Sequence, residues 1–367
     1  MEYRLPLKTA EVIVAMGPES DGNFSVCTNG KIYHSESFGD LLEEKNFRSF
    51  KSALQKYLKR EGLVPTVVLT DLHPDFLTTI YGRELAKKNK ARLATVQHHL
   101  AHVFSAVGDR LIDGQTHPDS FVGIAADGTG LGDDGLIWGG EIFKINISKK
   151  QASITRIGHL ENQTLIGGDL AIREPARVLV SVLGKFLGPA EVFSLIKQYY
   201  PKKTFDLLVA QASQRFNCYE TSSTGRILDA AAVLLGFSPN ERKRKHGPIA
   251  CLEENSSTPY LLKPAVTEDD GMLILKTTEL FAYLAARLDG DKRRLAATAQ
   301  KYIADGLGEI AKTGQAPIYF AGGMANNKII SSVLADQGAY LSTKIPRGDA
   351  GISFGQVIYF LLADSRD

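Results

Sequence analysis

Residues 120–147 read SFVGIAADGTGLGDDGLIWGGEIFKINI. The apolar runs at 120–127 and 135–147 predict two strands, and the glycines and aspartates between them predict a turn. An earlier apolar run, EVIVAMG at 11–17, predicts a strand that is also followed by a hairpin, because the pair Asn29-Gly30 favours a type I′ turn. A buried strand that leads into an antiparallel partner therefore occurs twice in the chain.

A longer series of elements follows each of these strands. After the first hairpin the sequence predicts a helix, a strand, a helix and a strand at 46–62, 66–70, 80–90 and 91–97. After the second it predicts a strand at 151–160, a long stretch of helical pattern, and then a strand, a helix, a strand and a last helix at 317–323, 326–337, 339–345 and 352–364.

Two β-β-β-α-β-α-β units, the second with a helical insertion, form the duplicated α/β plan of actin-like ATPases, whose lobes are RNase H-like. We predict an N-terminal lobe over 1–110 and a C-terminal lobe over 118–367, with the insertion at about 161–312. In this plan a nucleotide binds in the cleft between the lobes. The alternative is a pair of unrelated α/β domains.

The composition is that of an ordinary globular protein, with 44% hydrophobic and 23% charged residues over 367 residues. The formal net charge of +2 does not favour nucleic acid as a partner. Three cysteines without a CxxC pair exclude a disulfide framework and a cysteine zinc site, and they predict a cytoplasmic location. Because no uncharged apolar run approaches roughly 20 residues, no membrane span is predicted.

The most specific local pattern is the histidine cluster that follows the strand at 91–97. On a helix His98 and His102 share one face, so both imidazoles can hold one divalent metal ion, with a carboxylate completing the ligand set. His99 lies off that face, where it would contact substrate or solvent. The alternative for each histidine is a hydrogen-bonded place in the core.

Gly-rich and acidic turns supply the other candidates. The turn after 120–127 would bring backbone N–H groups to a phosphate and a carboxylate to a metal, or it is an ordinary hairpin. Gly322 and Gly323 would approach an adenine, with Asn327 either bonding the nucleotide or only capping a helix. Asp349 is either another cap or a metal ligand. The Ser/Thr-rich segment that ends at Gly225-Arg226 is an anion-friendly helix start or a plain cap.

The segment Glu241 to His246 is the one dense basic run. Charge runs are usually solvated loops, which is the interpretation preferred here. Contact with RNA or with an acidic protein tail is the alternative, although no aromatic residue lies within the run to stack on bases.

Taken together, these motifs resemble the C-terminal carbamoyltransferase module of the hydrogenase maturation protein HypF family. The resemblance rests on motifs along nearly the whole chain: Gly39-Asp40-Leu41, Asp71-Leu72-His73-Pro74, Val96 to His102, Asp127 to Gly130, Asp134-Gly135, Ile137 to Glu141, Gly168-Asp169, Ala171 to Pro175, Thr221-Ser222-Ser223, Gly225-Arg226, Gly322-Gly323 and Asp349 to Gln356. The wider group includes the tRNA threonylcarbamoyl transferase, which shares the fold and a His-x-x-x-His metal pair. The second half of that pair reads Glu-Gly-His, where this chain has Leu100-Ala101-His102.

The resemblance implies a set of site residues. Iron or zinc would be held by His98, His102, Asp127 and Asp349. ATP or carbamoyl-adenylate, with Mg²⁺ as a further candidate ion, would contact Gly128, Thr129, Gly130, Asp134, Gly168, Asp169, Gly322, Gly323 and Asn327. Catalysis is assigned to His98, His102, Asp127 and Arg173.

The implied activity is ATP-dependent transfer of a carbamoyl group from carbamoyl-adenylate to the C-terminal cysteine of a HypE-like partner, a step in making the cyanide ligand of NiFe hydrogenase. Complete family members carry acylphosphatase, zinc-finger and YrdC-like domains upstream, so separately encoded YrdC-like or acylphosphatase activating domains are expected as partners. Where the family usually has Glu-Gly-Gln-Ala, this chain reads His246-Gly247-Pro248-Ile249, which puts one substrate contact in question. The alternatives are a nucleotide- and metal-binding scaffold without catalysis, or a tRNA threonylcarbamoyl transferase-like enzyme.

Overall fold

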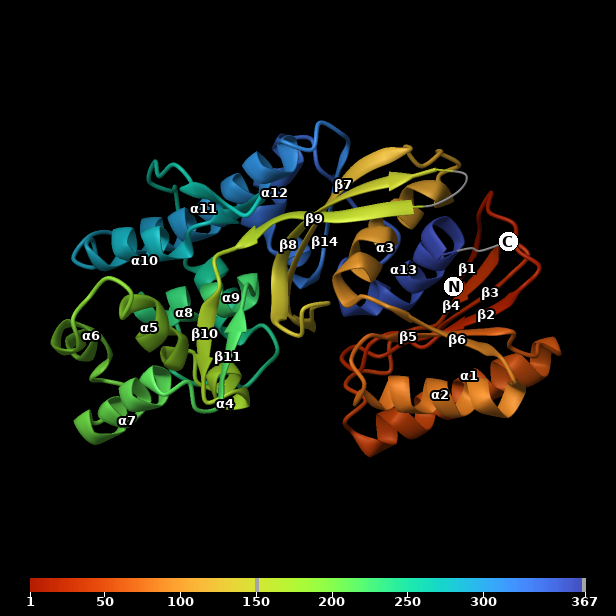
Figure 1. The fold of residues 1–367 in the computed structure, drawn as a ribbon, viewed down its shortest axis with the longest axis horizontal. Coiled ribbons are helices and arrows are strands. Elements are labelled where there is room, and N and C mark those ends of the chain that lie inside the picture. Colours follow the sequence, from red (N-terminus) through yellow and green to blue (C-terminus); the bar gives the residue numbers. More distant parts are fainter. Residues whose placement is uncertain (149–151, 365–367) are drawn as a thin grey trace.

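The computed structural model describes residues 1–148 and 152–364 and contains two β-sheets flanked by helices (Figure 1). The first sheet has the order β1-β4-β3-β2-β5-β6. Its strands are β1 (Glu2–Arg4), β2 (Val12–Ala15), β3 (Ser25–Thr28), β4 (Lys31–His34), β5 (Val67–Asp71) and β6 (Arg92–Val96). Asn29 and Gly30 have φ values of +48° and +76°, as the predicted type I′ turn between β3 and β4 requires.

Helices α1 (Glu44–Glu61) and α2 (Leu77–Asn89) cover one face of this sheet (Figure 1). The helical spacing of apolar residues in α1 buries Phe50 and Leu54 against Val14 and Val26 of the sheet. Gly62 ends α1 in the left-handed conformation, with φ +64°, as expected of a glycine after a helix.

The second sheet repeats the topology of the first. Its order is β12-β13-β9-β8-β7-β14-β15, so the series β9-β8-β7-β14-β15 matches β4-β3-β2-β5-β6. Its core strands are β7 (Ser120–Leu131), β8 (Ile137–Ile147), β9 (Ala152–Leu160), β14 (Ile318–Ala321) and β15 (Tyr340–Leu341). In both sheets the first three strands pair antiparallel and the next two are parallel. The predicted duplicated α/β fold is confirmed.

Two details of this lobe differ from the sequence-based prediction. The strand predicted at 339–345 is shorter, because Asp109 accepts hydrogen bonds from the backbone N–H groups of Thr343, Lys344 and Ile345 and draws that segment away from the sheet. The strand predicted from Gln151 begins at Ala152, and Gln151 itself lies outside the described residues.

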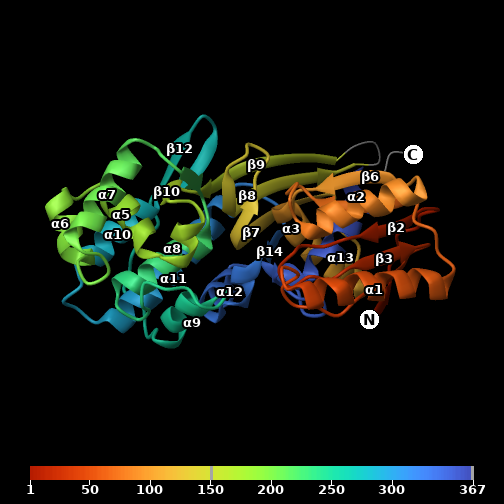
Figure 2. The ribbon, with the colours of Figure 1, turned by 90° about the horizontal axis from the view of Figure 1, so that it is seen from below.

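The sequence pattern predicts a helical insertion, but the insertion also contains β-strands. Its helices are α4 (Asp169–Arg173), α5 (Ala176–Leu183), α6 (Pro189–Ile196), α7 (Lys202–Ser213), α8 (Thr224–Leu234), α9 (Gly247–Glu254), α10 (Thr277–Ala285) and α11 (Lys292–Lys312). It also contains two hairpins, β10 (Gln163–Ile166) with β11 (Cys218–Thr221) and β12 (Val266–Asp269) with β13 (Met272–Leu275). Because β13 pairs with β9, the second hairpin widens the second sheet, while the helices form the far end of the molecule (Figure 2).

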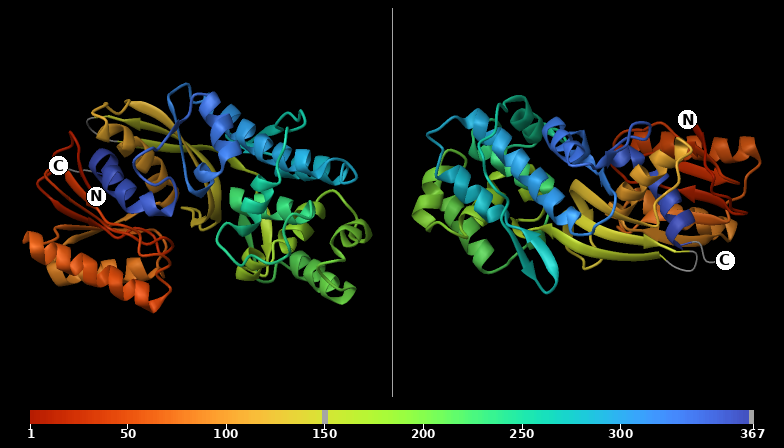
Figure 3. Two further views of the ribbon diagram at one scale, coloured as in Figure 1. Left: turned by 180° about the vertical axis from the view of Figure 1, so that it is seen from behind. Right: turned by 90° about the horizontal axis from the view of Figure 1, so that it is seen from above.

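Helices α3 (His98–Ile112) and α13 (Ile352–Tyr359) lie between the two sheets (Figures 1 and 3). Each packs mainly on the sheet of the other half of the chain: α3 contacts β7 and β14, whereas α13 contacts β2 and β3. The remaining elements of this half are η1 (Gly323–Asn326), α12 (Lys328–Asp336), η2 (Asp349–Gly351) and η3 (Phe360–Asp364). Among the helices of the described residues, none combines the length and the apolar character needed to cross a bilayer.

Glycines allow α3 and α13 to approach closely. A Cβ on Gly355 would lie 1.8 Å from the carbonyl oxygen of Ala101, and one on Gly108 would lie 2.5 Å from side-chain atoms of Phe354 and Ile358. Since backbone cannot move aside as a side chain can, Gly355 sets the distance between the two helices.

We therefore expect Gly355→Ala to lower the free energy of unfolding by about 2 kcal/mol or more, although alanine favours a helix over glycine by about 1 kcal/mol. Denaturant titration measures the change. Gly247→Ala is the matched control, because the nearest atom to its Cβ, Cβ of Arg244, lies 3.9 Å away. Equal stability of the two variants would contradict this account of the helix contact.

Candidate functional site

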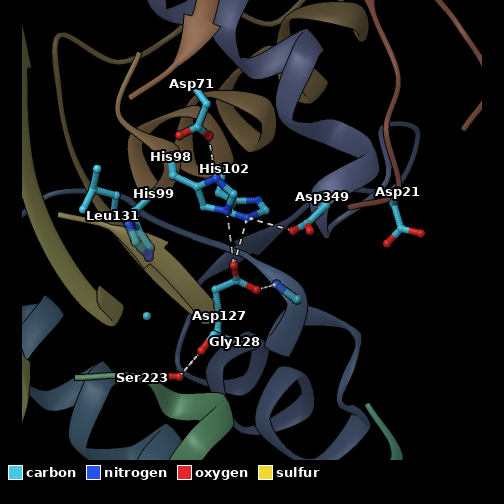
Figure 4. Close-up of polar contacts among 12 residues, drawn as sticks. Asp21, Asp71, His98, His99, His102, Asp127, Gly128, Leu131, Ser223 and Asp349 are labelled. Carbon is cyan, nitrogen blue, oxygen red and sulfur yellow. Dashed lines mark hydrogen bonds and ion pairs between the residues drawn. The ribbon is translucent and has the colours of Figure 1, made fainter. Parts of the chain in front are cut away.

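A bulge in β7 places the first carboxylate of the site. Ala126 pairs with Gly140 and Gly130 pairs with Trp138, so Asp127, Gly128 and Thr129 stand opposite a single residue of β8. Such a bulge re-aims side chains, and here the carboxylate of Asp127 turns toward α3 (Figure 4). After the bulge, β7 passes close to the histidines at Gly130. A larger residue would clash there, because a Cβ on Gly130 would lie 2.6 Å from Cε1 of His99.

Four side chains from α3, β7 and η2 converge at one point. His98, His102, Asp127 and Asp349 each offer an atom that could bind a metal, and these atoms all lie within 4.8 Å of one another. Nε2 of His98 lies 3.3 Å from Oδ2 of Asp127, and Nε2 of His102 lies 3.5 Å from the same oxygen and 3.6 Å from Oδ1 of Asp349 (Figure 4). All four side chains are buried.

A carboxylate outside the cluster orients His98. Oδ2 of Asp71, at the end of β5, lies 2.8 Å from Nδ1 of His98. This contact places the proton on Nδ1 and leaves Nε2 facing the cluster, which is the arrangement found behind metal-binding histidines. Asp71 is held in turn, because its Oδ1 accepts a hydrogen bond of 3.0 Å from the backbone N–H of His73.

The donor set fits a divalent ion. Neither ring nitrogen of His102 has a hydrogen-bond partner among the described residues, although the side chain is buried. An imidazole nitrogen about 3.5 Å from two carboxylate oxygens is too far for a good hydrogen bond. That separation suits an ion with ligand distances of about 2.0–2.2 Å between them, and two imidazoles with two carboxylates are ligands that zinc and iron accept.

The charged groups of the cluster shift one another's pKa values. Burial opposes ionisation of Asp127, but the neighbouring His102 and His98 outweigh it and hold the pKa of that carboxyl well below its usual range. Burial also opposes protonation of His98, yet Asp71 and Asp127 raise the pKa of its imidazole well above the ordinary value. Burial opposes protonation of His102 as well, but Asp127 and Asp349 raise the pKa of its imidazole. These interactions favour the ionised form of the Asp127 carboxylate and the protonated form of the two imidazoles.

Lys245 brings a positive charge to the cluster from the insertion. Its Nζ lies 2.7 Å from Oδ2 of Asp349 and 2.9 Å from Oδ2 of Asp21, which belongs to the first lobe. Although burial favours the neutral form of Asp349, Lys245 lowers the pKa of its carboxyl to about 2. The ammonium thus joins the two lobes at the edge of the candidate metal site.

The preferred interpretation of the basic run as a solvated loop was therefore wrong for part of it. Lys243 and Arg244 are exposed, but Arg242, Lys245 and His246 line a cavity of about 250 Å³. The same cavity is lined by His98, Asp127, Gly128, Thr129 and Asp349, and from the first lobe by Pro18, Glu19, Ser20, Asp40, Leu42 and Phe76. The cavity thus lies where the two lobes meet beside the four-residue cluster.

Some residues proposed from the sequence as nucleotide contacts have other partners. Gly323 donates a 3.0 Å hydrogen bond from its N–H to Oδ1 of Asp127, so it supports the cluster directly. Gly322 has φ +99°, and a Cβ there would lie 2.3 Å from the carbonyl of Ala126. Asn327 caps α12, because its Oδ1 accepts a hydrogen bond from the N–H of Ile330, as the capping alternative proposed. Its Nδ2 donates to Oε1 of Gln300 at 2.7 Å. The amide of Asn327 is therefore engaged inside the lobe.

Asp134 is held in the β7–β8 turn. Its Oδ1 accepts from the N–H of Leu136 at 2.9 Å, and its Oδ2 accepts from Nε1 of Trp138 at 3.1 Å. These contacts match the alternative of an ordinary Asp-Gly hairpin turn.

The residues at the start of α4 lie apart from the four-residue cluster. Gly168 has φ +58° at the N-terminus of α4, and the side chains of Asp169 and Arg173 are exposed. None of the three lines the cavity beside the cluster, although the carbonyl of Arg173 accepts a 2.8 Å hydrogen bond from the N–H of Arg242.

His99 reaches neither solvent nor the cavity. It is fully buried, and its Nδ1 lies 2.9 Å from Nε2 of Gln97. Burial, together with the positive charge of His98, lowers the pKa of His99 well below the ordinary value. The expectation that His99 would contact substrate or solvent was therefore wrong, and the core alternative describes it.

Residues 123–356 match the family described as "Carbamoyltransferase, Kae1-like Domain, second subdomain", and residues 8–109 match the "HypF Kae1-like domain". These matches define the class of protein as a Kae1-like domain, which here consists of two α/β lobes of the same topology. The chain belongs to the carbamoyltransferase domain family of HypF proteins.

Individual HypF proteins are similar to this chain over most of its length. A "Probable carbamoyltransferase HypF" from Methanocaldococcus jannaschii is 34% identical over 95% of this chain and 46% of its own length. A "Carbamoyltransferase HypF homolog" from Cupriavidus necator is 30% identical over 89% of this chain and 85% of its own length. The crystal structure of T. kodakarensis HypF is 27% identical, with a TM-score of 0.85 over 98% of this chain and 48% of that one.

A crystal structure of full-length HypF in a phosphate- and nucleotide-bound form is also similar, with 25% identity and a TM-score of 0.83 over 98% of this chain and 47% of that one. This chain spans about half the length of most of the HypF proteins it matches.

The geometry predicts the effect of removing the histidines. The double substitution His98→Ala with His102→Ala is expected to abolish binding of zinc or iron, because it removes both nitrogen ligands, while the chain stays folded. His99→Ala should retain the metal, since the His99 side chain faces Gln97 and the core. Elemental analysis of the purified, folded proteins measures the metal content of each variant. Equal metal content in the wild type and the double variant would refute the site.

The contact behind His98 gives a second prediction. Asp71→Asn removes the negative charge that orients the imidazole, so we expect metal affinity to fall by roughly 10- to 100-fold. Titration calorimetry with zinc measures the change. Asp75→Asn is the control, because Asp75 is exposed in the same loop and should leave the affinity unaltered. If both variants bind zinc like the wild type, Asp71 has no part in the site.

Proposed function

We propose that this chain transfers a carbamoyl group from carbamoyl-adenylate to the C-terminal cysteine thiolate of a HypE-like acceptor protein. Support comes from membership in the HypF carbamoyltransferase domain family and from the cluster of His98, His102, Asp127 and Asp349 beside a cavity between the lobes. The observation that carries the proposal is this cluster, because a buried set of four ligands next to a ligand-sized cavity is what metal-assisted acyl transfer requires.

The four side chains would hold iron or zinc, which when bound supplies a Lewis acid to polarise the carbamoyl or phosphate oxygen. In the reaction the thiolate sulfur bonds to the carbamoyl carbon, the bond from that carbon to the phosphate oxygen breaks, and AMP leaves with the bonding electrons. The acceptor supplies the nucleophile, so Cys27, Cys218 and Cys251 of this chain need not react.

The chain's own residues orient the reactants. Gly323 and the two histidines fix the carboxylate of Asp127, and the bulge at Gly128 and Thr129 exposes backbone at the cavity where the nucleotide phosphate would bind. Separately encoded YrdC-like or acylphosphatase domains would supply the activated carbamoyl group. The tRNA alternative rests on the basic run alone, and two of its residues, Arg242 and Lys245, contact internal carboxylates instead of facing outward.

The test is incubation of the metal-loaded chain with carbamoyl-adenylate and a HypE-like protein, or a peptide that ends in its C-terminal cysteine. We expect release of AMP and an intact-mass increase of one carbamoyl group on the acceptor. An acceptor without its terminal cysteine and the Asp127→Asn variant should give neither. If no acceptor gains mass and no AMP appears, the chain is a scaffold rather than a transferase.

A further inference from the structure

One face of α3 is polar, although most of the helix is buried. His98, His102, Ser105 and Asp109 follow one another at spacings of four, three and four residues, so their side chains share that face. All four are buried, and Asp109 has 0% of its surface exposed. A buried carboxylate is costly unless its oxygens are hydrogen-bonded or paired, so the partners of Asp109 define its role.

Both oxygens of Asp109 accept hydrogen bonds from one segment of the chain. Oδ1 accepts from the backbone N–H groups of Lys344 at 2.8 Å and Ile345 at 2.6 Å. Oδ2 accepts from the N–H of Thr343 at 3.1 Å and from the hydroxyl of Tyr340 at 2.7 Å. Hydrogen bonds to a carboxylate are stronger than those between neutral groups, so three successive N–H donors fix the path of this backbone.

The segment that Asp109 holds leads directly to Asp349. Three residues separate Ile345, the last of the hydrogen-bonded positions, from that candidate ligand. Beyond Asp349 the chain returns to the same face of α3, where a Cβ on Gly351 would lie 2.8 Å from Oγ of Ser105. The polar face of α3 therefore carries two of the four candidate ligands and contacts the loop of a third on both sides of Asp349.

We propose that Asp109 is a positioning residue for the metal site, which holds the Asp349 carboxylate at ligand distance from the histidines through the backbone of 343–345. Asp109 lies outside the four-residue cluster and acts on it only through Asp349. Since His102 and Asp109 belong to one helix, the anchored segment keeps a fixed place relative to the imidazoles. This role rests on the metal-binding part of the proposed function and is independent of carbamoyl transfer.

The test substitution is Asp109→Asn, because an amide offers one acceptor oxygen in place of two and turns its own N–H donors toward the backbone donors. We expect the affinity for zinc, measured by titration calorimetry, to fall by roughly 10-fold or more. Asp113→Asn is the matched control. Asp113 lies one turn further along the chain and contacts Lys344 of the same segment, but it is exposed and pairs only with the lysine ammonium, so zinc affinity should not change.

A double-mutant cycle separates positioning from a general loss of structure. Asp349→Ala removes the ligand, and in that background Asp109→Asn should cause no further loss of zinc affinity. With cobalt in place of zinc, Asp109→Asn and Asp349→Ala should move the visible absorption of the bound ion in the same direction, since both withdraw the same carboxylate. An equal loss of zinc affinity with and without Asp349 would refute the positioning role, and so would wild-type affinity in Asp109→Asn.

Tyr340→Phe keeps the role testable if Asp109→Asn does not fold. It removes a single hydrogen bond to Oδ2, so we expect zinc affinity to fall by roughly 2- to 10-fold, and only while Asp349 is present. Unchanged affinity in that variant would overturn the proposal. Because no measurement uses carbamoyl-adenylate or an acceptor, a chain that binds zinc as expected but transfers no carbamoyl group refutes only the transferase activity.

Discussion

The close contact between α3 and α13 is the constraint on which the site depends. α3 carries His98 and His102, and α13 follows directly after Asp349, so the spacing of the two helices sets the distance between the histidines and that carboxylate. The spacing is small because Gly355 presents no side chain to the carbonyl of Ala101. Since each helix also packs on the sheet of the other half, the two lobes and the four candidate ligands form one mechanical unit.

A second layer of charges surrounds the candidate ligands. Asp71 lies behind His98, and Lys245 lies beside Asp349. Arg226 and Arg242 both pair with Asp229, close to the Gly128 backbone. Asp71 thus places a negative charge behind a candidate ligand nitrogen, while Arg242 and Lys245 place positive charges along the cavity beside the four candidate ligands.

Much of this arrangement could be predicted from the sequence, for identifiable reasons. The duplicated lobes follow from local patterns, because buried strands and amphipathic helices leave periodic signals. His98 and His102 were recognisable because their spacing by itself places them on one helix face. The strands within the insertion were missed, since β10 and β11 are short and depend on partners distant in sequence.

The partners of the site residues were harder to foresee. Nothing in the run from Glu241 to His246 indicates that Lys245 turns inward while Lys243 stays exposed, because that difference arises from Asp349, about a hundred residues away. Asp71 was recognised only as part of the Asp71-Leu72-His73-Pro74 motif and was assigned no role, and its contact with His98 appears only when β5 lies beside α3. Long-range packing determines these contacts, and single-sequence patterns do not report it.

The position of α13 also has a consequence for the order of folding. Oε1 of Gln356 accepts a hydrogen bond from the backbone N–H of Gly17, a pair separated by 339 positions in the chain. The inner face of the first sheet is covered only when the last helix docks, so a ribosome must finish almost the whole polypeptide before that face is buried. Contacts of such high sequence separation form slowly, because a long loop must close first. A nascent chain therefore lacks the complete set of four candidate ligands until Asp349, close to the C-terminal end, has been synthesised and packed.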